Sequence, residues 1–91
     1  MIFEWNEAKR EKVLTERGID FLDLAASLFD GRAVITMPSR RGDEERFITI
    51  GLIEGRSVAL IWVRRDEAIR LITARRARDG EERTYRSVHG R

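Results

Sequence analysis

Residues Val58–Val63 read VALIWV, an apolar run without a polar interruption. Successive side chains of a strand point to opposite faces of a sheet, so such a run is apolar on both faces. We therefore expect a central strand here, covered on both sides, with Trp62 in the core. The run Phe47–Ile53 precedes it, and Glu54-Gly55 between the two has the length and composition of a two-residue hairpin turn.

Three further β-rich segments surround this hairpin. Ala33–Met37 is expected to be a strand ended by Pro38, with Ser39–Glu45 as a polar loop after it. Ile69–Ala74 is expected to follow the hairpin as another strand. Met1–Trp5, with its bulky apolar side chains, has the composition of a first strand.

Helical signals fill the remaining segments. Asn6 is a good N-cap for Glu7–Arg17, and Gly18 stands at the position of a left-handed helix stop. Asp20 is expected to cap a second helix, whose apolar residues recur at i, i+3, i+4, i+7 and i+8: Phe21, Leu24, Ala25, Leu28 and Phe29.

A last helix is expected to begin near Gly80, because Asp79 and Glu82 have the spacing of a capping box. The expected order is β-α-α-β-β-β-β-α. This is an α+β domain with a mostly antiparallel sheet, two N-terminal helices and one C-terminal helix.

The composition excludes several protein classes. The chain of 91 residues has no cysteine and one histidine, so a disulfide scaffold and thiolate metal sites are excluded. We expect one domain spanning residues 1–91, without cofactor or metal. The N-terminal segment lacks a long apolar stretch, and the chain has no transmembrane run, so we expect a cytoplasmic location.

Charge is distributed unevenly along the chain. Of 18 basic residues, 16 are arginine, and the others are Lys9 and Lys12. Residues 1–45 carry 7 basic and 10 acidic groups, whereas residues 46–91 carry 11 basic and 6 acidic groups. Arginine is suited to bidentate phosphate contacts and to stacking on bases. The pattern indicates a nucleic-acid partner on one side, or a solvated surface rich in arginine.

Elimination narrows the chemistry that these residues permit. The glycines are scattered at turns, and neither a cysteine nucleophile nor an internal histidine is present. Arginine, glutamate, lysine and tyrosine still allow one metal-free reaction, the attack of an RNA 2′-hydroxyl on its own 3′-phosphate. Glu45, Lys9 or Tyr85 would then take the proton roles, because arginine is a poor general base.

Four stretches together resemble a known family. In the front half these are Phe3-Glu4-Trp5 with Lys9, and the run from Gly18-Ile19-Asp20-Phe21 to Phe29-Asp30. In the back half they are Glu45-Arg46-Phe47 with Ile50-Gly51, and Ile69–Ala77, which reads IRLITARRA, followed by Glu81 and Tyr85. In this order they resemble the BrnT family of type II toxin–antitoxin systems.

The resemblance implies a RelE-like fold and a ribonuclease that blocks translation. It also implies a cognate DNA-binding antitoxin, and a dimer of toxin–antitoxin pairs is consistent with it. The family pattern has lysine and histidine where this chain has Glu16 and Arg17. These departures allow a degenerate toxin that serves only as an antitoxin-binding co-repressor. The arginine-rich surface alone allows a second alternative, a non-enzymatic nucleic-acid-binding module.

Together, arginine chemistry and the resemblance give a set of candidate site residues. We expect Arg75 and Arg46 to stabilise the transition state, with Glu45, Lys9 and Tyr85 as candidates for the proton roles. The expected RNA-binding residues are Arg70, Arg76, Trp5 and Arg17. Each also has a simpler interpretation: packing for Trp5 and Tyr85, a cross-strand pair for Glu45, an exposed helix position for Lys9, and solvated or salt-bridged arginines.

Overall fold

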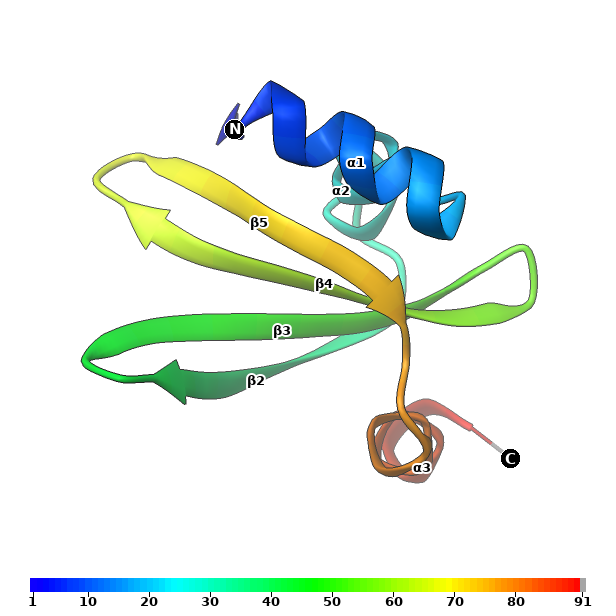
Figure 1. Cartoon of the computed structure of the whole chain (residues 1–91). Coiled ribbons are helices and arrows are strands. Elements are labelled where there is room, and N and C mark those ends of the chain that lie inside the picture. The colour runs from blue at the N-terminus through cyan, green and yellow to red at the C-terminus, as the bar shows by residue number, and fades with distance from the viewer. Residues whose placement is uncertain (91) are drawn as a thin grey trace.

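The computed structural model describes residues 1–90, with Arg40 and Arg41 described by their backbone alone. The predicted α+β architecture and its order of elements are confirmed (Figure 1). The elements are β1 (Ile2–Glu4), α1 (Glu7–Arg17), α2 (Phe21–Leu28), β2 (Val34–Arg41), β3 (Glu44–Ile53), β4 (Arg56–Arg65), β5 (Ala68–Arg76) and α3 (Asp79–His89).

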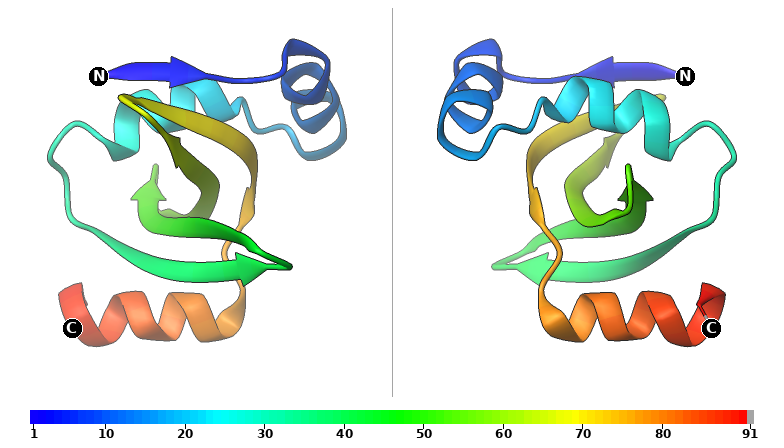
Figure 2. Two further views of the ribbon diagram at one scale, coloured as in Figure 1. Left: turned by 90° about the vertical axis from the view of Figure 1, so that its left-hand side faces the viewer. Right: turned by 90° about the vertical axis from the view of Figure 1, so that its right-hand side faces the viewer.

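The strands form one sheet in the order β1-β5-β4-β3-β2. Only β1 and β5 are parallel, and the other neighbours are antiparallel. The central place predicted for Val58–Val63 is confirmed, because all of these residues are buried in β4. Helices α1 and α2 cover one face of the sheet, and α3 lies against the other (Figure 2).

Each face has its own core. On the first face, α2 packs its apolar stripe against β4 and β5 around Trp62, which is 6% exposed as predicted for a core residue. The indole Nε1 of Trp62 donates a hydrogen bond of 2.8 Å to Thr49 Oγ1, so its polar atom is satisfied inside the core. On the second face, Tyr85 of α3 packs against Ile50 and Ala59.

Most of the predicted local signals are confirmed. Asn6 Oδ1 accepts from Lys9 N at 3.0 Å, and Asp20 Oδ1 accepts from Leu22 N at 3.0 Å. Gly18 ends α1 with a φ of 69°. In the β3–β4 turn, Glu54 and Gly55 have φ values of 52° and 78°, as a type I′ hairpin requires.

Two predictions about element boundaries were wrong. Strand β2 passes through Pro38 to Arg41, so the predicted loop Ser39–Glu45 shrinks to a turn at residues 42–43. Proline is tolerated there because β2 is the edge of the sheet, where outer backbone N–H groups have no strand partner.

The N-cap of α3 also differs from the prediction. The helix begins at Asp79 with Arg78 as its N-cap, and Glu81 Oε1, rather than a Glu82 oxygen, accepts from the backbone N of the N-cap residue at 2.8 Å. The physical reason is that Glu81 also binds Arg75 on β5, which fixes the first turn of the helix to the sheet.

Candidate nucleic-acid interface

An open hollow of about 450 Å³ lies where α1 passes over β5. It exists because β1 pairs only with residues Ala68–Arg70, so the rest of β5 has no strand partner on that side within residues 1–90. Its lining consists of Asn6, Ala8, Lys9, Lys12, Arg70, Leu71 and Ile72. Among these described residues are three cations and no carboxylate.

The three cations are available to a ligand. Lys9 and Lys12 are one turn apart on α1, so their side chains share one side of the helix, and both residues are exposed. No ion pair of either lysine occurs within the described part of the chain. The guanidinium of Arg70 is 4.0 Å from Glu4 Oε1, a long contact between partly exposed groups that contributes little.

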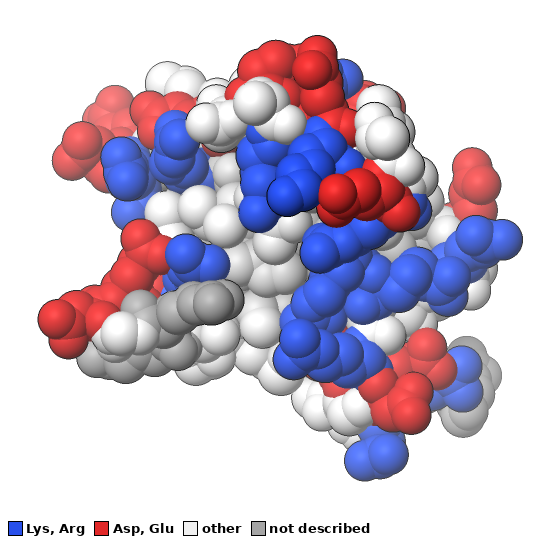
Figure 3. Space-filling model, in the orientation of Figure 1, with Lys and Arg blue, Asp and Glu red and all other residues white. Residues whose placement is uncertain are grey.

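Arg17 continues this positive charge along β5. Its Nη1 donates to Ala74 O at 2.8 Å and to Thr73 Oγ1 at 3.2 Å. The guanidinium thereby covers a backbone carbonyl on the strand edge that β1 leaves open. A band of Lys and Arg side chains runs from α1 over β5 toward α3, with acidic side chains at its borders (Figure 3).

Arg75, the main predicted phosphate-binding residue, is held in an ion pair. It donates two hydrogen bonds to the Glu81 carboxylate, at 2.7 and 2.9 Å, and these side chains are only 19% and 13% exposed. Hydrogen bonding from the Arg75 guanidinium lowers the pKa of Glu81, and the carboxylate raises the pKa of Arg75 in return. The pair joins α3 to β5.

Arg46 and Glu45 lie far from Arg75. Arg46 is opposite Ser39 and pairs with Glu44, whereas Arg75 is opposite Ala59, which in turn is opposite Ile50. Four residues along β3 and two strand spacings separate the two arginines, about 13 Å along the sheet and about 10 Å across it. The structure therefore does not bring the predicted transition-state pair together.

Two aromatic candidates have structural contacts. Tyr85 is 7% exposed, and its hydroxyl donates to Ala33 O at 3.2 Å. Trp5 is partly buried against the first core, and its Nε1 donates to Glu7 Oε1 at 2.8 Å. These contacts agree with the packing interpretation of both residues.

Of the predicted residues, Lys9 and Arg70 share the hollow, and Arg17 lies next to it. Arg76 is exposed at the end of β5, where its Nε lies 3.4 Å from Ser57 O. Sequence reasoning missed Lys12. The signal that marks it is the i, i+3 spacing of the only two lysines in the chain.

The described residues contain no group of three or more His, Asp or Glu side chains with the geometry of a metal site. Within the same residues, no helix is long and apolar enough to span a membrane.

This fold, with a strand edge lined by cations, defines a small α+β protein with a surface suited to a polyanion. Residues 5–81 match the model of a family described as the ribonuclease toxin BrnT of type II toxin–antitoxin systems. The chain belongs to this family, as the resemblance predicted. Membership implies RNA as the substrate and a cognate antitoxin as the partner. A search of curated proteins found no match.

The Arg75–Glu81 pair predicts a specific pH dependence of stability. Because the pKa of Glu81 is lowered in the folded state, its contribution is present above the pKa of the unfolded chain and is lost as pH falls through the folded value. Urea unfolding should show Glu81→Gln less stable than the parent by about 1–3 kcal/mol at pH 7. The difference should shrink between about pH 5 and pH 3.

The matched control is Glu67→Gln, an exposed residue of the β4–β5 turn, which should track the parent at every pH. A pH-independent difference between Glu81→Gln and the parent would contradict the assigned ion pair.

Proposed function

We propose that this protein cleaves RNA without a metal ion, by attack of a 2′-hydroxyl on the adjacent phosphate, in the hollow between α1 and β5. The observation that carries the proposal is the lining of the hollow by Lys9, Lys12 and Arg70 without a carboxylate. These three cations attract the phosphate oxygens, and the lining has no negative charge to repel them, so they supply the positive charge that the reaction needs.

The reaction forms a bond between O2′ and phosphorus and breaks the bond between phosphorus and O5′. The proton of the 2′-hydroxyl passes to solvent water, because the lining of the hollow has no carboxylate to accept it, and O5′ takes a proton as it leaves. Negative charge increases on the non-bridging oxygens as the pentacoordinate intermediate forms, and the cations of the hollow stabilise it more strongly than the ground state. The products are a 2′,3′-cyclic phosphate and a 5′-hydroxyl.

Lys9 is the group we assign to the leaving oxygen. An ammonium group carries protons that it can give up, whereas a guanidinium does not deprotonate in proteins. Lys9 is exposed at the mouth of the hollow and is free of ion pairs within the described residues. Arg70 and Lys12 then hold the phosphate, and Arg17 and Arg76 bind the strand beyond it.

Arg75 takes a positioning role in this proposal, since its guanidinium is bound to Glu81.

Toxin activity blocks translation through loss of RNA. Silencing comes from a cognate antitoxin that also binds DNA, in an assembly of paired toxin and antitoxin.

Cleavage of a single-stranded RNA by the purified protein should persist in excess EDTA and leave a 2′,3′-cyclic phosphate end or its 3′-phosphate hydrolysis product. Mass spectrometry of the fragments identifies the ends. Loss of cleavage in EDTA that Mg²⁺ restores would refute the 2′-hydroxyl mechanism. Salt-dependent binding without cleavage would instead indicate a non-enzymatic module.

Lys9→Ala should lower the single-turnover cleavage rate about 10²–10⁴-fold, because it removes the proton donor of the leaving group. Lys9→Arg keeps the charge and should restore RNA affinity but little of the rate, which separates proton transfer from binding. The control is Arg83→Ala, an exposed cation of α3 on the other face of the sheet. Parental rates for Lys9→Ala would exclude the hollow as the catalytic site.

Induced expression of the chain alone in bacteria should arrest growth, and co-expression of the adjacent reading frame should relieve the arrest. Growth curves and the rate of amino-acid incorporation measure the effect. Normal growth with abundant folded protein would favour a degenerate toxin that only binds its antitoxin.

A further inference from the structure

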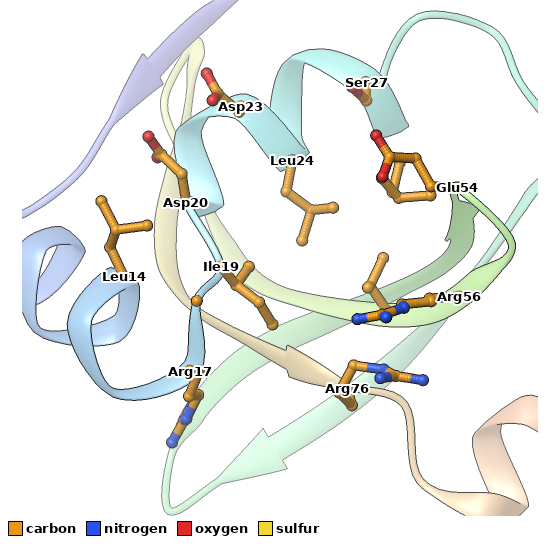
Figure 4. Close-up of a pocket in the computed structure, with 13 residues that line it drawn as sticks. Leu14, Arg17, Ile19, Asp20, Asp23, Leu24, Ser27, Glu54, Arg56 and Arg76 are labelled. Atoms are coloured by element: carbon orange, nitrogen blue, oxygen red, sulfur yellow. The ribbon is translucent and has the colours of Figure 1, made fainter.

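A second and larger depression, of about 760 Å³, lies beyond Arg17. The loop between α1 and α2, helix α2 itself and the β3–β4 hairpin enclose it (Figure 4). Its volume is in the range of pockets that hold small organic ligands. It shares no lining residue with the hollow, but two of its arginines, Arg17 and Arg76, are those assigned above to the RNA strand beyond the cleaved phosphate.

The lining combines three kinds of surface. The floor is apolar and includes Ile19 and Leu24, while Leu14, which is 43% exposed, lies at the α1 end of the pocket (Figure 4). Three arginines line one side, and Asp23, Ser27 and Glu54 line the opposite side (Figure 4). The arginines are Arg17, Arg56 and Arg76.

Some of these polar groups are engaged and others are available. Both carboxylate oxygens of Asp20, at the rim, accept hydrogen bonds from Arg10, at 2.9 and 2.7 Å. In contrast, Asp23 and Glu54 are exposed, and among the described residues neither forms an ion pair. The same holds for Arg56 and Arg76. The pocket therefore presents unpaired cations and unpaired carboxylates on opposite sides of an apolar floor.

We propose that this pocket binds one unpaired nucleotide of the RNA strand, next to the site of cleavage. The inference rests on the proposed ribonuclease function and specifies how that site selects its substrate. The base lies on Leu14 and Ile19, and the phosphate faces the arginines. The carboxylates of Asp23 and Glu54 accept hydrogen bonds from the base edge.

Arg17 connects the two sites. It lines the pocket, and its guanidinium also donates to Thr73 and Ala74 on the strand that forms the hollow. A strand leaving the hollow along β5 reaches Arg17 and then the pocket. Single-stranded RNA is commonly recognised in this way, with splayed bases on apolar or planar groups and hydrogen bonds to their edges.

The charges predict which bases fit. Carboxylates accept hydrogen bonds from amino groups, which cytosine, adenine and guanine carry and uracil lacks. A base with an exocyclic amino group should therefore bind more tightly than uracil. The neutral amide of Glu54→Gln would weaken this distinction, and Arg56→Ala would weaken phosphate binding for every base.

The test uses the whole protein with methyl-labelled Ile, Leu and Val, titrated with tetranucleotides that are 2′-O-methylated and so cannot be cleaved by this route. NMR shifts should appear at Leu14 and Ile19 in the pocket and at Ile72 in the hollow, with one dissociation constant. Arg56→Ala should weaken binding roughly 5- to 100-fold, and Glu54→Gln should reduce the preference for amino-bearing bases over uracil.

The chain offers matched controls. Arg65→Ala alters the other exposed end of β4, and Glu67→Gln alters the other tight turn, so both should bind as the parent does. Shifts at Ile72 without shifts at Leu14 and Ile19 would overturn the pocket and leave the hollow as the RNA site. No shift at any of the three would reject the RNA surface altogether, and the pocket with it.

Discussion

The structure depends on one strand that is apolar on both faces. Val58–Val63 of β4 is buried throughout, so the sheet is stable only if helices cover both of its sides. The first side is covered by α2, whose Phe21, Leu24 and Leu28 are all buried. Within residues 1–90, the second side is covered by α3, a polar helix whose buried residue is Tyr85. Apolar burial is therefore weaker on that side.

Polar contacts compensate for the weak apolar face of α3. The Arg75–Glu81 pair fixes the first turn of α3 to β5. In the middle of the helix, the Tyr85 hydroxyl donates a hydrogen bond to the carbonyl oxygen of Ala33. At its end, His89 Nε2 lies 2.8 Å from Val34 O. One of these contacts has a functional consequence. It engages Arg75, the residue that the sequence analysis favoured as a phosphate ligand, in an ion pair with Glu81. Lys9, Lys12 and Arg70 between α1 and β5 remain accessible to a phosphate.

The sequence predicts the elements well because their signals are local. The unbroken run of β4, the spacing of α2, the two N-caps and the hairpin turn each follow from neighbouring residues. The prediction that a strand ends at Pro38 was wrong, because proline is tolerated in an edge strand. Whether a strand lies at an edge is decided by the assembled sheet. The distance between Arg46 and Arg75 also depends on the assembled sheet, since residue type alone carries no information on distance. Arg46 and Arg75 are both arginines in β-rich segments, but the strand register places them far apart in the sheet.

Arg17 shows how the short first strand links stability and function. Because β1 pairs with only three residues of β5, the strand edge beyond them is open to solvent and to unwanted pairing with other chains. Arg17 covers the Ala74 carbonyl on this edge and, unlike a neighbouring strand, brings positive charge with it. A longer β1 would pair more of the backbone N–H and C=O groups on this edge of β5. It would also fill the hollow that Lys9, Lys12 and Arg70 line. A cationic side chain in place of a strand keeps that space accessible to an anionic polymer.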